Sequence, residues 1–136
     1  MIEKSMREWL QTALATPNVY HTGIPQGVND DCVTLQVTGK KREYTQAHTS
    51  TICTTTFLVG IWLVADNEIS GYYDVKTWAE NIREILEAGP TAGTLGSHSV
   101  YSITIHNETD TPPQYLEGKN EMVVGVNLTA EVVHTQ

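Results

Sequence analysis

Polar side chains that could carry out chemistry gather in one segment, His106-Asn107-Glu108 with Asp110 close behind. An imidazole beside two carboxylates can transfer protons or bind a metal ion. The segment follows an alternating apolar run, and the end of a strand is a common place for such residues. Polar residues also fill exposed loops. Two hypotheses follow: a small enzyme with its site at His106, Glu108 and Asp110, or a solvated loop.

Other patterns that carry catalysis are absent from the chain. It contains no phosphate-binding glycine loop, no dinucleotide-binding glycine pattern, no HExxH zinc motif and no GxSxG nucleophile motif. Cys32 and Cys53 lack the CxxC spacing of a zinc site and are expected to be small, half-buried thiols. Their places on neighbouring predicted strands leave a disulfide open. The sequence therefore favours a protein that is not an enzyme and that needs no cofactor or metal.

Composition limits the class of protein. A chain of 136 residues with 40% hydrophobic residues fits one domain, residues 1–136, with an ordinary core. The net charge of −8 repels phosphate backbones and disfavours broad nucleic-acid binding. Two cysteines form no disulfide framework, and the first ten residues, MIEKSMREWL, include acidic side chains and no apolar signal region. We therefore expect a protein that folds in a cytoplasm.

The segment from Thr49 to Asp66, TSTICTTTFLVGIWLVAD, dominates the predicted fold. Its apolar part, Phe57 to Ala65, is too short to span a bilayer, which takes about 20 residues as a helix. Threonine and valine favour an extended backbone. With period two, one face is continuously apolar from Phe57 onwards and the other changes from polar to apolar. The pattern predicts a long strand that is solvated on one face at its start and covered on both faces at its end.

The remaining elements follow from periodicity and turn residues. Apolar residues at helical spacing predict helices over 2–15 and 74–88, the second with Asp74 as N-cap and Gly89-Pro90 as its end. Alternation predicts strands over 32–38, 101–106 and 121–134, and polar loops over 17–31 and 106–120. We therefore predict an α+β domain, with a mostly antiparallel four-stranded sheet and two helices packed on one face, in the order α-β-β-α-β-β.

Apolar residues are left over on the second face of this predicted sheet. Leu58 and Trp62 lie there on the long strand, and Val123 and Val133 on the last one. Two helices on one face cannot cover them, so we expect either self-association or cover by the loop over 17–31. A ligand-binding or adaptor module with a groove at Trp62 is a further alternative.

Two segments are candidate oligomer or tube interfaces. Lys40, Lys41 and Arg42 hold three of the eight basic residues at a predicted hairpin tip, with Tyr44 beside them. Such a cluster suits an electrostatic contact with an acidic neighbour, although it is also typical of a solvated turn. The segment Thr111–Tyr115 adds a stiff turn at Pro112 and Pro113 and an exposed aromatic, Tyr115.

The order of elements, over nearly the whole chain, resembles a known family. An amphipathic N-terminal helix precedes a loop with Gly23-Ile24-Pro25-Gln26-Gly27. A hairpin follows, with the turn KKREYTQAHTS and the long strand TTTFLVGIWLVA, then the helix DVKTWAENIREILEA and a final hairpin that runs into VGVNLTAEVVH. Together these segments resemble the tail terminator (tail completion) proteins of long-tailed bacteriophages.

The resemblance implies a structural role in a virion. Proteins of this family form a ring, usually hexameric, that caps the head-proximal end of the tail tube and stops its polymerisation. The implied partners are further copies of the chain, the tail tube protein and a head-completion or connector protein, with DNA only passing through the channel and no membrane. A head-completion role in the same virion is the alternative, and no individual site residue is carried over from the family.

Overall fold

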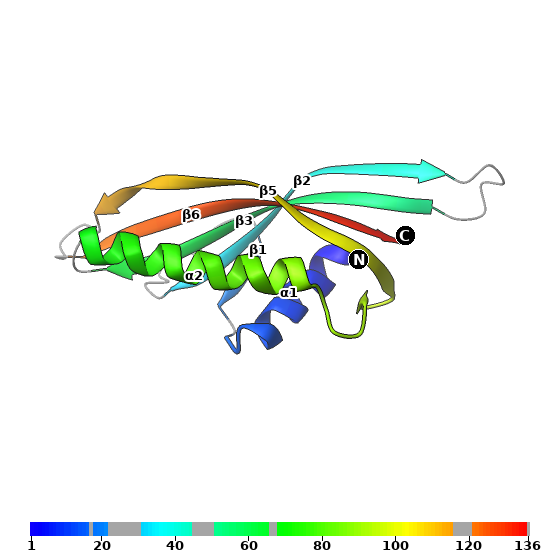
Figure 1. The fold of residues 1–136 in the computed structure, drawn as a ribbon, viewed down its shortest axis with the longest axis horizontal. Coiled ribbons are helices and arrows are strands. Elements are labelled where there is room, and N and C mark those ends of the chain that lie inside the picture. Colours follow the sequence, from blue (N-terminus) through cyan, green and yellow to red (C-terminus); the bar gives the residue numbers. More distant parts are fainter. Residues whose placement is uncertain (17, 22–30, 45–50, 66–67, 116–120, 136) are drawn as a thin grey trace.

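A computed structural model describes residues 1–16, 18–21, 31–44, 51–65, 68–115 and 121–135. Two helices and six strands follow one another along the chain (Figure 1): α1 (Ile2–Ala13), β1 (Val19–His21), β2 (Cys32–Tyr44), β3 (Thr51–Ala65), α2 (Glu68–Ala88), β4 (Thr94–Leu95), β5 (His98–Tyr115) and β6 (Met122–Thr135). No helix in these ranges is long and apolar enough to cross a membrane.

The predicted four-stranded sheet is wrong, because the sheet has six strands in the order β1-β2-β3-β6-β5-β4 and is mixed. The two additional strands, β1 and β4, are too short to show alternation and lie in segments rich in turn residues. β1 pairs with β2 in parallel, whereas the other neighbours are antiparallel. The four predicted strands form the centre of this larger sheet, with β6 between β3 and β5.

Two predicted boundaries are also wrong. β5 does not end at His106 but continues through the expected polar loop to Tyr115, paired with β6 along its length and interrupted by bulges. α2 begins at Glu68, so Asp74 lies inside the helix and is not its N-cap. The helix includes Gly71, which lies close to Ala65 of β3 and Val124 of β6. A methyl group there would lie 2.6 Å from the Ala65 side chain.

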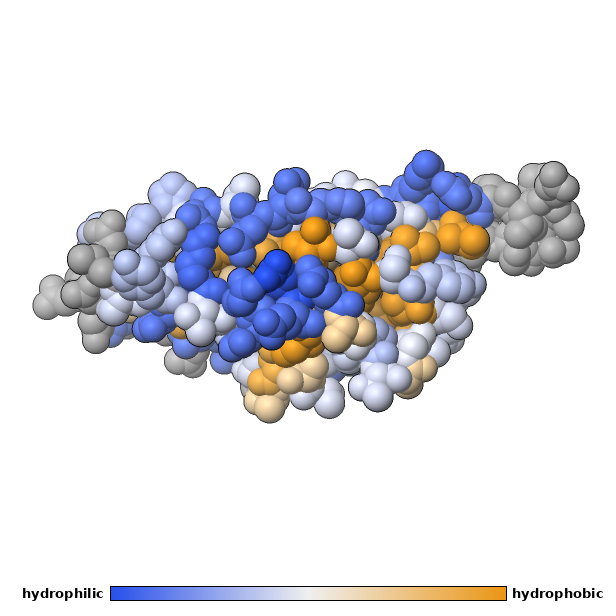
Figure 2. All heavy atoms as spheres, viewed as in Figure 1, coloured by the Kyte–Doolittle hydropathy of each residue, from blue (hydrophilic) through white to orange (hydrophobic). Residues whose placement is uncertain are grey.

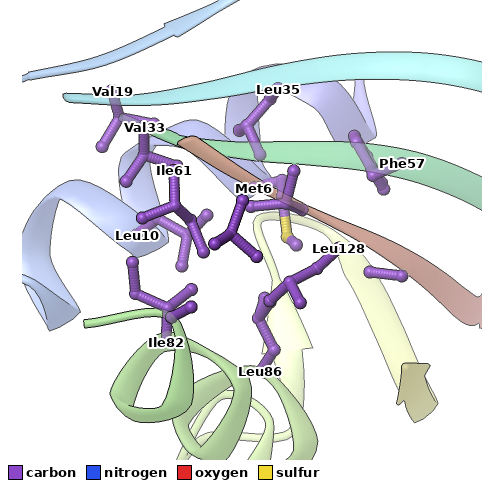
Figure 3. Close-up of a cluster of buried hydrophobic side chains, with 14 of the residues drawn as sticks. Met6, Leu10, Val19, Val33, Leu35, Phe57, Ile61, Ile82, Leu86 and Leu128 are labelled. Atoms are coloured by element: carbon purple, nitrogen blue, oxygen red, sulfur yellow. The ribbon is translucent and has the colours of Figure 1, made fainter. Parts of the chain in front are cut away.

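Both helices lie on the same side of the sheet (Figure 1), and the core fills the space between them and the strands (Figure 3). The predicted apolar face of the long strand is confirmed, since Phe57, Val59 and Ile61 are fully buried and face the helices. The predicted apolar stripe of each helix is also buried, with about one side chain per turn facing the sheet, as the 3.6-residue period requires. The buried helical residues are Ile2, Met6 and Leu10 of α1 and Val75, Ala79, Ile82 and Leu86 of α2.

Candidate assembly surfaces

The opposite side of the sheet carries no helix, and we call it the helix-free face. Leu58, Val64 and Val123 are half-buried on it, and Ile52 is 40% exposed. The apolar residues predicted to be left over on this side are therefore partly accessible in the isolated chain. The loop over 17–31, an alternative cover, lies largely outside the described residues.

Trp62 on this face lies across two strand glycines. Its indole Nε1 donates a hydrogen bond to the Thr34 hydroxyl at 3.0 Å. A methyl group on Gly125 would lie 2.6 Å from two carbons of the indole ring, and one on Gly60 would lie 2.6 Å from Nε1. Glycine in a strand often marks such a close approach. The indole is therefore packed closely against the sheet at Gly60 and Gly125.

β2 and β5, which are covered only in part by the short strands β1 and β4, each have a long unpaired edge. β1 pairs with β2 only from Val33 to Leu35, which leaves the edge from Gln36 to Tyr44 without a described neighbour. On β5, β4 pairs with His98 and Ser99 and the Val100 N–H donates to the Gly93 carbonyl, and the edge beyond Val100 has no described neighbour. Unpaired backbone N–H and C=O groups on such edges are templates for pairing with another chain.

The predicted basic cluster lies on the open edge of β2. Lys40 and Arg42 pair with Thr55 and Cys53 of β3, which are buried on the helix side, so their side chains project to that side. Lys40 Nζ lies 2.5 Å from a carboxylate oxygen of Glu3 in α1. Lys41 alternates to the helix-free face, where its Nζ lies 3.5 Å from a Glu43 oxygen. The side chain of Tyr44 and the rest of the predicted hairpin tip lie outside the described residues.

The second predicted segment is not a turn. Pro112 and Pro113 lie at a bulge within β5, and Tyr115 is its last residue, 70% exposed. A bulge on an edge strand accommodates proline because no ladder hydrogen bond is needed there. The bulge lines an apolar cavity of about 490 Å³ together with Tyr72 and Tyr73 of α2. β5 ends at the opposite end of the molecule from the end of β2 (Figure 1), so the two predicted interface segments belong to different surfaces.

The residues of the hypothetical enzyme site have different partners. His106 Nε2 lies 3.0 Å from a Glu131 oxygen. Glu108 and Asp110 instead form ion pairs with Lys76 of α2, and the hydrogen bond to Asp110 raises the pKa of that lysine above its ordinary value. Within the described ranges, no three His, Cys, Asp or Glu side chains are placed to hold a metal ion. The geometry therefore does not support a site at His106, Glu108 and Asp110.

Glu108 and Asp110 give the open edge of β5 its charge. They pair with Leu128 and Val126 of β6, which are buried on the helix side, so these carboxylates also project to that side. They carry two negative charges against the one positive charge of Lys76. The upper rim of the molecule, which β5 forms on the left, is hydrophilic (Figure 2). The open edge of β5 is therefore acidic, whereas that of β2 is basic.

The two cysteines cannot form the disulfide that the sequence leaves open. Cys32 lies opposite Trp62, whereas Cys53 lies opposite Arg42, near the far end of β2. Each residue of a strand adds about 3.3 Å, so the thiols are separated by most of the strand. Both are free and buried, and burial, assisted by the charge of Asp31, raises the pKa of Cys32 to about 11.

A buried histidine, missed by the sequence analysis, ties the strand ends together. His134 Nε2 accepts a hydrogen bond from the buried Thr55 hydroxyl at 2.8 Å, and its Nδ1 donates to the Thr135 carbonyl at 2.6 Å. His98 Nδ1 donates to the same carbonyl at 2.9 Å. These roles are those of a neutral ring protonated at Nδ1, which is the nitrogen that faces the carbonyl oxygen. Burial lowers the pKa of His134. The hydrogen bond to the Thr135 carbonyl and the charge of Glu3 raise this pKa, whereas the charges of His98 and Lys40 lower it further, and the net shift is downward.

We expect this histidine to make the fold weaker in acid. Because its folded-state pKa lies below the unfolded value of about 6.5, the unfolded chain takes up the proton first as pH falls. The contribution of neutral His134 to the unfolding free energy is complete above about pH 6.5, and it is lost as pH falls through the lowered pKa. Urea titrations between about pH 7.5 and 5.5 should show a smaller decrease in unfolding free energy for His134→Gln than for the wild type. Equal slopes would contradict this assignment.

Comparison with known proteins finds a similar structure but no similar sequence. No known protein-family profile matches the chain, and no curated protein matches it in sequence. The structure is similar to a chain of the virion of a native gene transfer agent (GTA) particle, with a TM-score of 0.52 and 13% identity. The match covers 97% of this chain and 91% of that chain. At this identity the similarity establishes a shared fold, and it is consistent with a structural virion protein.

Proposed function

We propose that this chain is a structural virion protein that forms a ring at the head-proximal end of a phage-like tail tube. The observation that supports this most is the fold shared along 97% of the chain with a component of a GTA virion. In this role the ring stops polymerisation of the tube protein and provides the surface that joins tail to head. It works without catalysis or cofactor.

Two physical features support assembly from identical copies. The open edges of β2 and β5 and the apolar residues of the helix-free face all lack partners among the described elements. Neighbouring copies in a ring would supply those partners. Each copy also contributes a net charge of −8. A ring of such copies repels DNA electrostatically, so that DNA slides through the channel without binding to its wall.

The proposed partners follow from this position. They are further copies of the chain, as a homohexamer, the tail tube protein on one side and a head-completion or connector protein on the other. The ring assembles in the cytoplasm of the bacterial host and remains in the virion. It makes no contact with a membrane and reads no DNA sequence.

Light scattering across a range of protein concentrations, with and without the tail tube protein of the same particle, tests the proposal. We expect a discrete ring-sized species, or a monomer that becomes one when the tube protein is added. Electron microscopy should then show tubes capped at one end. A strict monomer that ignores tube protein would contradict the proposal. A ring that binds the connector but leaves tubes uncapped would indicate the head-completion role instead.

Charge reversal of the basic cluster should weaken assembly. We expect Lys40→Glu/Lys41→Glu/Arg42→Glu to raise the concentration needed for ring formation or tube capping by about a hundredfold at physiological salt, because the cluster faces an acidic partner. Lys40→Glu also places a second carboxylate beside Glu3, so Lys41→Glu/Arg42→Glu serves as the milder variant. Lys4→Glu, an exposed change on α1, is the control. Unchanged assembly in both variants would mean that the cluster is only solvated.

A further inference from the structure

The two open edges carry opposite charge, and this restricts how copies can pair. Two β2 edges would bring Lys40, Lys41 and Arg42 of both copies together, and two β5 edges would do the same with Glu108 and Asp110. Like charges placed opposite one another on neighbouring strands are unfavourable. Only β2 against β5 brings opposite charges together. Such a contact uses different surfaces on the two copies, so it is the type of interface that closes into a ring.

The direction of the strands suits this pairing. Three antiparallel pairings connect β2 to β5 through β3 and β6, so β2 runs antiparallel to β5 within one sheet. A second copy placed beside the first in the same orientation therefore brings β2 antiparallel to the β5 of its neighbour. The helices of both copies then remain on the same side. Lys40, Arg42, Glu108 and Asp110 also project to that side, as their partners on β3 and β6 show.

One register satisfies the charges and the shape of both edges. With Arg42 opposite Glu108, antiparallel geometry places Lys40 opposite Asp110. Each strand is regular over this stretch, since the bulges lie before Gly39 in β2 and outside 107–111 in β5. The same register brings Leu35, the last β2 residue that β1 covers, opposite Tyr115, the end of β5. The neighbour's β5 can therefore pair with β2 from Gln36 onwards, the stretch that β1 leaves open, and β4 lies beyond the end of β2.

We propose that β2 of one copy pairs with β5 of the next copy, antiparallel and with Arg42 opposite Glu108, so that the sheet continues from subunit to subunit. The partner that this edge fits is thus a second copy of the chain, held by backbone hydrogen bonds and selected by charge. The inference rests on the ring proposed above and specifies which surfaces build it.

Cysteine cross-linking tests the register directly. Lys41 and Thr109 face each other in the proposed pairing, and both project to the helix-free face, since their partners are Thr54 and Asn127. Within one chain β3 and β6 separate them, so a disulfide can form only between copies. Lys41→Cys/Thr109→Cys should give a ladder of disulfide-linked multimers on mild oxidation. Native Cys32 and Cys53 are buried and contribute little background.

The control keeps the face and the edge but changes the register. Lys41→Cys/Thr104→Cys moves the second thiol back towards the start of β5, on the same side of the strand because Thr104 lies opposite Glu131, and should give no ladder. Single variants can form dimers at most. A ladder in the register pair alone supports the proposal. A discrete oligomer with no ladder, a ladder of equal strength in the control, or a monomer at every concentration would overturn it.

A charge exchange provides the second measurement, independent of thiol chemistry. Arg42→Glu and Glu108→Arg alone should each weaken association by about tenfold in light scattering, and the double variant should recover most of the loss. Circular dichroism confirms that each variant is folded. Failure of the double variant to recover would overturn the register. If cross-linked rings form but do not cap tail tubes, the proposed function fails while the interface remains.

Discussion

Phe57→Ala is expected to lower the free energy of unfolding by about 3–5 kcal/mol, the largest effect of any single change considered. The side chain is fully buried at the middle of β3, between Val37 of β2 and Ala130 of β6. Truncation removes its burial and leaves a cavity that rigid neighbouring strands cannot fill. The loss is a large part of the 5–15 kcal/mol that holds a typical domain together.

Urea denaturation followed by circular dichroism measures this loss, at a concentration where wild type and variant have the same oligomeric state. Tyr101→Ala is the matched control, because this aromatic is 62% exposed and its removal should change stability by less than about 0.5 kcal/mol. A Phe57→Ala loss below about 1 kcal/mol would mean that the core between the helices and β3 is packed differently.

Gly125→Ala is expected to cost about 1–3 kcal/mol although it adds a single methyl group. That methyl group would lie 2.6 Å from two carbons of the Trp62 ring, closer than van der Waals contact allows. The indole must then tilt away from the sheet, which also strains its hydrogen bond to Thr34. The cost arises on the helix-free face rather than in the main core.

A double-mutant cycle separates this contact from a general loss of strand stability. In a Trp62→Ala background the methyl group meets no indole ring, so the same Gly125→Ala change should cost less than half as much. Gly39→Ala is a control for added bulk, because a methyl group there has nothing within 4 Å. An equal cost in both backgrounds would contradict the close packing of Trp62 on the glycine.

Periodicity predicted the parts of the fold that face the core. The alternation of Phe57, Val59 and Ile61 and the helical spacing of Val75 and Ile82 follow directly from burial on one side. β5 beyond His106 was missed because an open edge strand exposes most of its side chains and so shows no apolar alternation. This part of β5 is extended because it pairs with β6, and the periodicity of a single segment carries no information about its pairing partner.

The candidate surfaces were predictable in part. The basic cluster was identified from its composition, but its acidic counterpart was interpreted as a possible catalytic group, because only the sheet register shows that Glu108 and Asp110 face Lys76. Likewise, the close fit of Trp62 on Gly60 and Gly125 needs the alignment of β3 with β6. Such contacts join residues distant in sequence, so no local pattern reports them.

The position of β6 has a consequence for synthesis on the ribosome. This strand is the last of the described strands to be made, yet it lies at the centre of the sheet between β3 and β5. Until it leaves the exit tunnel, β3 has no partner on that side and the core beneath it stays open. Folding of the sheet should therefore begin only after β6 has been made, and it should be limited by contacts distant in sequence. A nascent chain stalled before Met122 should be sensitive to protease and bound by chaperones, and a nascent chain from which β6 has emerged should be neither.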